Sequence, residues 1–479
     1  MNNFPNSGSF SGGPGILRGV SALALIVLLS GCGGGGGGSS VSSDTSPEQS
    51  PADSAQKSSS ANDSSAQEPI LSFTDSATAA ASQSSGDSDT TMAVAGDGTS
   101  DTAAVSDSAD ETDATAAPEP DPDGQGAVEL PPEFEQWERD MITYGKKWGE
   151  YISDASSSNR LNAVYYDGQW IYYQIADYTG DAEPWTTYAR AAEKVYRDGY
   201  LKPNGYKIPG YWRFPHGLYE DNLRGSDSTL EQIAAIRDNP SFSDPAWTDY
   251  SWKWYHARYS REIAYAIHSN LTAEKAGLPR QESRMQAYLK MAENHLDQWL
   301  RGDYSNPAIG DTSHDRMKPF MFGLTAHALI EFYEWEKENG RDPNAYVHDI
   351  PGRLAEFARW MFEEAKNVNG KRMWVPDLGG SGGAWNDNGG TGYGAFRYVD
   401  AGSRSELEPA PDLNLLIAPA YAWLYNQTGD MAFRSMADEL FSGGVALAAT
   451  HWNGKIFDQN YRWSFKYVQW RKQGDRKWR

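Results

Sequence analysis

Three short segments concentrate side chains that can perform acid–base chemistry on an anionic substrate. Residues 211–222 read YWRFPHGLYEDN, residues 254–262 read WYHARYSRE, and residues 313–318 read SHDRMK. The last segment precedes Pro319, a favourable first residue of a helix, so we expect its cations at a helix N-terminus, which stabilises anions. The segments thus combine arginine and lysine, which neutralise carboxylates, with histidine and tyrosine, which transfer protons.

Removal of a proton next to a carboxylate needs this combination. A β-elimination on a uronic acid residue must neutralise the sugar carboxylate, remove the proton from C5 and protonate the leaving oxygen. We predict that Tyr259 acts as base and acid with His216 as its partner. The alternative is that these two residues only stabilise the fold. The predicted neutralising cations are Arg258, Arg316 and Lys318, and the predicted substrate contacts in these segments are Arg213, Asn222, Trp212, Trp254 and His314.

Hydrolysis of a glycosidic bond is the competing reaction. It needs two carboxyl groups flanking the bond, one with a raised pKa so that it can donate a proton. The acidic residues near expected helix starts are Glu220, Asp221, Asp249, Glu262, Asp315 and Asp412. A third alternative is a protein that binds glycans without cutting them.

A long glycine-rich stretch, residues 369–412, contains GGSGGAWNDNGGTGYGAFRY. Loops of this length are usually functional, and aromatic faces stack well on sugar rings, so we expect a wall or lid over a saccharide site. Its predicted substrate contacts are Trp385, Asn386 and Tyr393. We expect no cofactor and no transition-metal site, because the chain has 8 histidines and 1 cysteine. The alternative is a structural Ca²⁺ held by Asp377 and Asp387.

The elements that position these residues are expected to be helices. Apolar and aromatic residues from Phe134 to Tyr151 recur at spacings of three and four, which marks one face of an α-helix. Strand signals are confined to short pieces such as residues 161–165 and 456–467. Further helices are predicted over residues 251–269, 317–339, 351–365, 413–427 and 431–441.

Two segments look like copies of one helical hairpin. Residues 171–181 read IYYQIADYTGD and residues 417–430 read IAPAYAWLYNQTGD, and a second predicted helix follows each. In the Thr-Gly-Asp connector, glycine suits a left-handed helix end and aspartate can cap the next helix. Repeated hairpins of this size indicate a solenoid or, when closed, a toroid.

These helix–TGD–helix repeats, rich in tyrosine and tryptophan, resemble the (α/α) toroid folds of glycoside hydrolases and polysaccharide lyases, including alginate and glucuronan lyases. The resemblance covers most of residues 129–479. It implies an all-α domain, an incomplete or closed toroid, with a substrate cleft at one end. It also implies an acidic polysaccharide as partner, and we expect a monomer. The chain has no basic stripe or reader motif for nucleic acid.

The N-terminal part is expected to be a lipoprotein signal followed by a tether. Arg18 precedes an apolar run that is too short to span a bilayer and ends in Leu29-Ser-Gly-Cys32, which resembles the lipobox of bacterial lipoproteins. We therefore predict a signal peptide over residues 1–31, a lipid on Cys32 as the membrane anchor, and an outer-membrane location. Residues 32–128 lack Trp and Tyr, and residues 1–128 account for −15 of the net charge of −23. Such a composition predicts a disordered tether.

Overall fold

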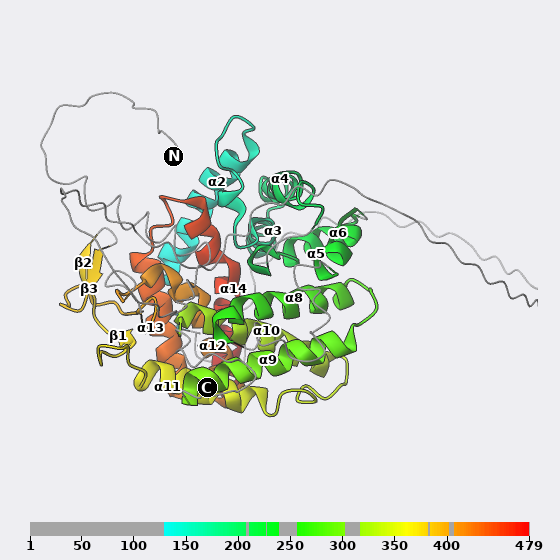
Figure 1. The fold of residues 1–479 in the computed structure, drawn as a ribbon. Coiled ribbons are helices and arrows are strands. Elements are labelled where there is room, and N and C mark those ends of the chain that lie inside the picture. The colour runs from blue at the N-terminus through cyan, green and yellow to red at the C-terminus, as the bar shows by residue number, and fades with distance from the viewer. Residues whose placement is uncertain are drawn as a thin grey trace, which may run out of the picture. The chain divides into compact units, whose positions relative to one another are not determined.

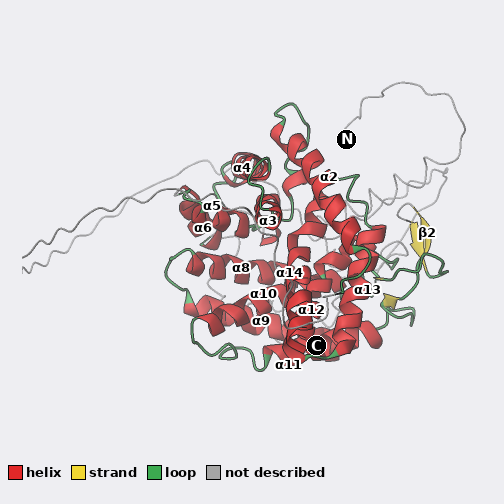
Figure 2. Ribbon diagram, turned by 180° about the vertical axis from the view of Figure 1, so that it is seen from behind, coloured by secondary structure: helices red, strands yellow, loops and turns green. Residues whose placement is uncertain are grey.

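The computed structural model describes residues 129–206, 210–226, 228–238, 256–301, 317–381, 384–401 and 407–478. These ranges are mostly helical, as the sequence predicted, with a few short strands (Figures 1 and 2). No helix within them is long and apolar enough to cross a bilayer. The predicted signal peptide, the predicted tether and the candidate residues Cys32, Trp254, His314 and Arg316 lie outside the described residues.

One set of helices forms a circuit of neighbours. Its members are, in chain order, α3 (Gly168–Thr179), α5 (His216–Leu223), α8 (Ser260–Lys275), α10 (Pro319–Glu338), α12 (Ala418–Thr428) and α14 (Gly454–Trp478). Each packs against the next, and α14 packs against α3 as well, so the contacts return to their start.

A second helix follows most members of this set and packs against the member that precedes it. These helices are α4 (Trp185–Tyr196), α6 (Ser228–Arg237), α9 (Glu282–Arg301), α11 (Ile350–Glu363) and α13 (Met431–Leu447). The first described helix, α2 (Phe134–Ser153), packs against α4, α13 and α14.

Burial distinguishes the two sets and follows from their sequences. In α8 every residue from Ser260 to Ala273 is buried, and in α12 every residue from Ala418 to Tyr425 is buried. A helix surrounded by protein on all sides needs no polar face. By contrast, α4, in the second set, buries a single stripe that includes Trp185, Ala189 and Ala192 and exposes Arg190 and Lys194. Helices of the circuit therefore form the interior.

Neighbouring helices of the circuit run in the same direction. The starts of α3 and α5 meet at Asp167 and His216, and Tyr173 bonds Asp221 further along both helices. Likewise α10 and α12 meet at His327 and Leu416, and then at Glu334 and Trp423. The N-terminal ends of these helices, and the segments that precede them, therefore gather on one side of the domain.

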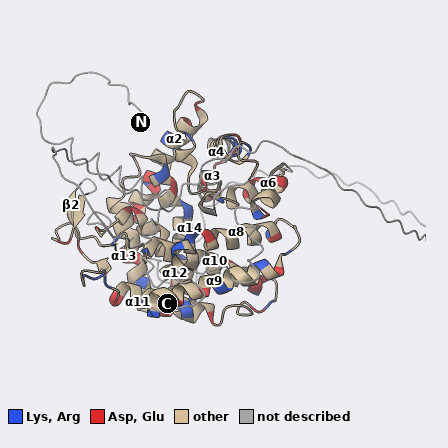
Figure 3. Ribbon diagram, viewed as in Figure 1, with Lys and Arg blue, Asp and Glu red and all other residues tan. Residues whose placement is uncertain are grey.

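The remaining elements are short. The 3-10 turns are η1 (Asn162–Val164), η3 (Gly210–Trp212), η6 (Ala257–Tyr259) and η7 (Pro411–Leu416), and a π-helical turn, η2, covers Arg197–Leu201. Two antiparallel pairs of strands lie between α11 and α12: β1 (Trp374–Val375) with β4 (Ala395–Phe396), and β2 (Gly379–Ser381) with β3 (Ala384–Asn386). Lys and Arg, like Asp and Glu, are spread over the described helices (Figure 3).

The Thr-Gly-Asp connectors behave largely as predicted. Gly180 and Gly429 end α3 and α12 in the left-handed region, with φ of +74° and +73°. Asp430 then caps α13 by accepting the N–H of Ala432. Asp181 does not cap α4, because α4 begins four residues later with Pro184 at its N-cap position.

The expected strands were wrong. Residues 162–164 form a 3-10 turn, and residues 456–467 lie inside the long helix α14. Every residue from Gly454 to Ser464 is buried, so polar and apolar residues occupy all sides of the helix and the helical period is hidden. Two predicted helices also shifted: α8 begins at Ser260, and residues 411–416 form η7 before α12 begins.

Candidate functional site

Asp167 connects the starts of α3 and α5. It adopts a left-handed conformation with φ of +70°, and its carboxylate accepts the N–H of Trp170, which caps α3. The same carboxylate accepts the N–H groups of His216 and Gly217 at 3.1 and 3.2 Å. A buried carboxylate with three backbone donors fixes the direction in which the His216 side chain leaves α5.

Gly217 is required at this junction. A Cβ atom there would lie 2.6 Å from Oδ1 of Asp167 and 2.7 Å from the backbone nitrogen of Trp170. We expect Gly217→Ala to push Asp167 off α5 and to lower the free energy of unfolding by about 1 to 3 kcal/mol, the usual cost of overpacking. Urea denaturation of the two proteins measures this change. As a control, Ala182→Gly alters an exposed residue that contacts no part of the site, and unchanged stability in Gly217→Ala would contradict the packing argument.

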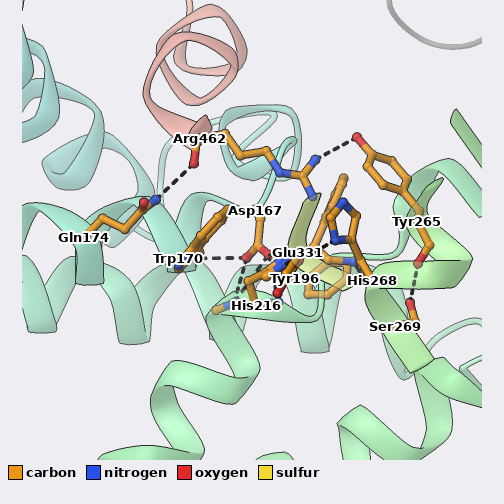
Figure 4. Close-up of polar contacts among 12 residues, drawn as sticks. Asp167, Trp170, Gln174, Tyr196, His216, Tyr265, His268, Ser269, Glu331 and Arg462 are labelled. Carbon is orange, nitrogen blue, oxygen red and sulfur yellow. Dashed lines mark hydrogen bonds and ion pairs between the residues drawn. The ribbon is translucent and has the colours of Figure 1, made fainter. Parts of the chain in front are cut away.

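Three side chains from three helices meet at one carboxylate oxygen (Figure 4). Oε2 of Glu331, on α10, lies 3.0 Å from Nε2 of His216 and 2.7 Å from Nδ1 of His268, on α8. The other oxygen, Oε1, accepts a hydrogen bond from Nζ of Lys275 at 2.7 Å. Both histidines are buried, whereas Glu331 and Lys275 keep 17% and 18% of their side-chain surface exposed. Solvent therefore reaches this group from the Lys275 side.

The pKa values of the residues in this group are shifted in different directions. Burial alone would raise the pKa of Glu331, but Lys275 and the two histidines hold that pKa well below its usual range. Burial alone would lower the pKa of His216, but Glu331 and Asp167 outweigh burial and raise the pKa. Burial lowers the pKa of His268 to about 4, because the charge of His216 adds to burial and Glu331 only partly compensates. Of the two histidines, His216 is therefore the more readily protonated, and His268 is neutral at neutral pH.

Aromatic rings enclose the two histidines. Trp170 stacks on His216 with ring centroids 4.4 Å apart. Trp463, on α14, contacts both histidines edge-on or tilted and stacks on His327 at 4.1 Å. Burial lowers the pKa of His327 well below its usual value, so this ring is neutral. The aromatic enclosure lowers the local dielectric and strengthens every charge interaction inside it.

Arg462, also on α14, completes the polar group. One terminal nitrogen, NH1, donates to the hydroxyl of Tyr265 at 2.7 Å, and the guanidinium lies over the rings of Tyr265 and Trp463. Its Nε and NH2 atoms are buried and have no hydrogen-bond partner within the described ranges. Figure 4 shows Arg462 on the same side of the site as Tyr265 and His268. An anion that entered here would find two free donors in a fork.

This arrangement can transfer protons at a carbon atom next to a carboxylate. His268 has Nδ1 held by Glu331 and Nε2 without a partner among the described residues, so Nε2 is the free basic atom. A carboxylate that holds one ring nitrogen fixes the tautomer and the orientation of a general base. A guanidinium such as that of Arg462 can neutralise a carboxylate, and a histidine with a raised pKa, such as His216, can donate a proton.

His216, His268 and Glu331 could also serve as metal ligands. Their ligand atoms lie within 4.8 Å of one another, and two histidines with one carboxylate suit zinc or iron. The Lys275 ammonium on the same carboxylate opposes a second cation there. The separations of 2.7 and 3.0 Å are those of hydrogen bonds. The three side chains thus form a hydrogen-bonded group whose ligand atoms are also those that a metal ion would use.

The structure brings His216 into this group but leaves Tyr259 apart from it. Tyr259 immediately precedes α8, nine residues before His268, which is about 13 Å along a helix. Arg258 lies beside Tyr259, with its guanidinium 5.3 Å from the centre of that ring, and Lys318 precedes α10 over the ring of Tyr398. These three residues lie at the N-terminal ends of the interior helices, on the side where the loops gather.

The other candidates from residues 211–222 have different surroundings. Arg213 is fully buried and hydrogen-bonded to Tyr288, and burial lowers its pKa to about 10. Trp212 is half-buried and stacks on Tyr200 at 4.3 Å. Asn222 donates to the carbonyl oxygen of Ser226 at 3.4 Å. These contacts belong to the packing around α5.

The glycine-rich stretch forms a separate small assembly. Trp385 and Asn386 lie on β3, and Tyr393 donates to Glu133 next to α2. Asp377 accepts backbone N–H groups from Gly390 and Gly392, whereas Asp387 forms ion pairs with Lys371 and Arg397. The two carboxylates suggested as Ca²⁺ ligands therefore bind different groups.

Sequence reasoning missed most of the central group. Asp167, His268, Glu331 and Arg462 were not candidates, because each lies in or next to a helix that reads as core. The available signal was a histidine or an arginine inside a helix that is otherwise apolar or aromatic, as in IAYAIHSN for His268. The same signal is given by histidines that only fill a core. Only the convergence of the four helix starts or helices that carry these residues distinguishes a candidate site from a core position.

Comparisons with known proteins do not identify a relative: no family model, no curated protein and no solved structure matches the chain. The geometry of the central group is therefore the basis for a functional proposal.

Proposed function

We propose that this protein is a polysaccharide lyase that cleaves a uronic-acid-containing polysaccharide by β-elimination. The observation that supports this proposal best is the free Nε2 of His268, a neutral histidine held by Glu331, close to the free N–H groups of Arg462. Elimination from a uronate needs a base and a cation side by side, and these two residues supply them.

In the proposed reaction Arg462 binds the carboxylate of the uronic acid residue and so acidifies its C5–H. Nε2 of His268 takes the C5 proton, the C4–O bond breaks with formation of the C4–C5 double bond, and protonated His216 gives its proton to the leaving oxygen. Glu331 holds both histidines throughout, and its pairing with Lys275 keeps it ionised. Tyr265, which accepts a hydrogen bond from Arg462, positions the guanidinium.

We propose that the scaffold is an (α/α) toroid. Two findings support this: the contacts of α3, α5, α8, α10, α12 and α14 return to their start, and a second helix follows most of them. In such a toroid Tyr259, Arg258 and Lys318 would line the entrance and contact the glycan. We further propose that a lipid on Cys32 attaches the enzyme to the outer membrane, as its lipobox-like sequence indicates.

Glycoside hydrolysis is the second candidate, and one observation favours it. Asp458 and Asp167 lie close together next to Gly168, and burial followed by the charge of Asp167 raises the pKa of Asp458 well above its usual value. A carboxyl with a raised pKa next to a second carboxyl is the kind of pair that hydrolysis uses. We place this pair second, because hydrolysis would leave the free Nε2 of His268 and the free N–H groups of Arg462 without a role. A non-catalytic glycan-binding protein is the third candidate.

The deciding experiment incubates the full chain with alginate, glucuronan, pectate, ulvan and neutral glucans. Ultraviolet absorbance detects the double bond that elimination creates, and a reducing-end assay detects every cut. We expect both signals to rise together on one acidic glycan. Reducing ends without absorbance would overturn the lyase in favour of the carboxyl pair, and binding without either signal would favour the third candidate.

The pH dependence of kcat should reflect the two histidines. Activity is expected to fall below about pH 4, where His268 becomes protonated, and to fall at alkaline pH, where His216 loses its proton at a pKa above the usual 6.5. The raised pKa of His216 also stabilises the fold below about pH 6.5, and this contribution is lost as the pH rises through the folded-state pKa. The lowered pKa of His268 has the opposite effect on the pH dependence of stability. With respect to this group the fold is most stable above about pH 6.5, and that stability is lost as the pH falls towards 4. A kcat profile that rises continuously with pH would contradict the role of His216 as acid.

A further inference from the structure

The three side chains that meet at Glu331 come from three helices and all carry atoms that bind metals. Nε2 of His216 on α5, Nδ1 of His268 on α8 and Oε2 of Glu331 on α10 lie within 4.8 Å of one another (Figure 4). Among the described residues, no other group of three His, Cys, Asp or Glu side chains converges in this way. The sequence did not indicate such a site, because it does not show which of the 8 histidines meet.

The separations are close to those around a single ion. Oε2 of Glu331 lies 3.0 Å from Nε2 of His216 and 2.7 Å from Nδ1 of His268. Two atoms bound to one zinc ion at about 2.1 Å lie about 3.0 Å apart at a right angle and about 3.4 Å apart at a tetrahedral angle. Shifts of roughly half an ångström in these side chains therefore admit an ion. Glu331 keeps 17% of its side-chain surface exposed, so an ion can reach the group from its side.

The surroundings of His216 are those of a metal-bound histidine. Its other ring nitrogen, Nδ1, lies 3.7 Å from Oδ2 of the buried Asp167. A carboxylate behind a ligand histidine orients the ring and increases its affinity for the metal. Trp170 stacks on His216 at 4.4 Å, and Trp463 packs against both histidines. An apolar shell of this kind controls the access of water to a bound ion.

The types of ligand determine which ion fits. Two imidazole nitrogens and one carboxylate oxygen suit zinc and similar divalent transition metals. Calcium and magnesium prefer sites built from oxygen atoms, so they are poor occupants of this group. Three protein ligands also leave coordination positions that water can fill, as in zinc sites that are not fully closed by protein.

Lys275 limits the affinity of such a site. Its Nζ atom pairs with Oε1 of Glu331 at 2.7 Å, so the ammonium and an ion on Oε2 would share one carboxylate. Arg462 adds a second positive charge near His268. The carboxylates of Glu331 and Asp167 offset these two charges, but the repulsion between Lys275 and the ion remains. Removal of the Lys275 charge should therefore strengthen metal binding, which a purely structural role of the group would not produce.

We propose that His216, His268 and Glu331 bind a divalent metal ion of the zinc type, and that the bound ion and proton transfer exclude each other. Coordination of Nδ1 of His268 leaves the ring proton on Nε2, so this atom is no longer a base. Coordination of Nε2 of His216 sends to solvent the proton that this atom would give to the leaving oxygen. Zinc therefore inhibits elimination. This consequence rests on the proposed function, whereas the metal site itself does not.

The test is metal binding by the full chain after treatment with a chelator and dialysis. Zn²⁺, Co²⁺ and Ca²⁺ are titrated separately by calorimetry, and the visible absorption of Co²⁺ reports its ligands. We expect one Zn²⁺ per chain, a Co²⁺ spectrum of mixed nitrogen and oxygen ligation that Zn²⁺ abolishes, and no competition by Ca²⁺. Absence of Zn²⁺ binding would overturn the site, even when a glycan is cleaved.

Three variants locate the ion. His268→Asn should weaken Zn²⁺ binding by about 10-fold or more, because it removes a ligand nitrogen. Lys275→Met should strengthen binding by roughly 10-fold, because it removes a like charge next to the ion. His348→Asn changes an exposed histidine outside the group and is the matched control, with normal binding expected. Wild-type affinity in His268→Asn, or unchanged or weaker binding in a folded Lys275→Met protein, would place the ion elsewhere and overturn the site.

Activity then separates the site from the proposed function. Zinc should slow elimination over the concentration range in which it binds, and a chelator should restore the rate. If Zn²⁺ binds at the three residues but the metal-free protein cleaves no glycan, the site is upheld and the proposed lyase function fails. Equal or faster elimination in the zinc-loaded protein would overturn the mutual exclusion of metal and proton transfer.

Discussion

Replacement of His268 with asparagine is expected to lower the rate of elimination by about 10²- to 10⁴-fold, the usual contribution of a general base. The side-chain amide of asparagine can take the place of Nδ1 and still donate to Glu331, which lies 2.7 Å from that atom in the wild-type protein. It has no atom in the place of Nε2, so the variant keeps the hydrogen bond and loses the base. The assay is the initial rate of ultraviolet absorbance on the best acidic glycan, with KM measured alongside kcat.

The matched control is His348→Asn, which changes an exposed histidine outside the central group. It should retain the full rate. Thermal unfolding of both variants shows whether folding is intact. Wild-type turnover in a folded His268→Asn protein would exclude this residue as the base and would return Tyr259 to first place among the candidates.

Replacement of two buried arginines on α14 should have opposite effects on stability and activity. Arg471 donates to both oxygens of Asp438 and forms an ion pair with Asp475. Arg471→Met therefore removes the cation that Asp438 and Asp475 share, which leaves Asp438 with the hydroxyl of Tyr467 and Asp475 with Arg434 and Tyr425. We expect it to lower the free energy of unfolding by about 3 kcal/mol, the lower end of the range for a broken buried pair. Arg462→Met removes a guanidinium with one hydrogen bond to Tyr265, and we expect a change within about 1 kcal/mol.

The activities should reverse this order. Arg462→Met is expected to lose about 10²- to 10³-fold in turnover, because the cation that neutralises the substrate is gone. Arg471→Met should keep its turnover under conditions where it remains folded. Urea denaturation and the absorbance assay on the same preparations measure both quantities. A strong loss of stability in Arg462→Met would show that this arginine holds the fold together and would remove the main reason to place it in a site.

Part of the fold could be predicted from the sequence, and particular residues show where this prediction succeeded and where it failed. The spacing of Trp137, Met141 and Trp148 predicted α2, because an exposed helix repeats its apolar face every three to four residues. The same method failed to predict the buried part of α14 as a helix, because a helix covered on all sides has no such repeat. His216 was recognised because it stands in a segment crowded with polar residues. His268 and Glu331 were not, because their neighbours in the sequence are core residues.

The sequence by itself determined the helical character of residues 129–479, the glycine-ended hairpins, and the kinds of side chain available for acid–base chemistry. Periodicity and helix-end preferences act between residues a few positions apart, so they can be read along the chain. Only the tertiary structure decided that the pKa of His216 is raised and that the pKa of His268 is lowered. That difference arises because Asp167, Glu331 and Lys275 come from segments more than 50 positions apart, and burial in one core sets the charge of each against the others.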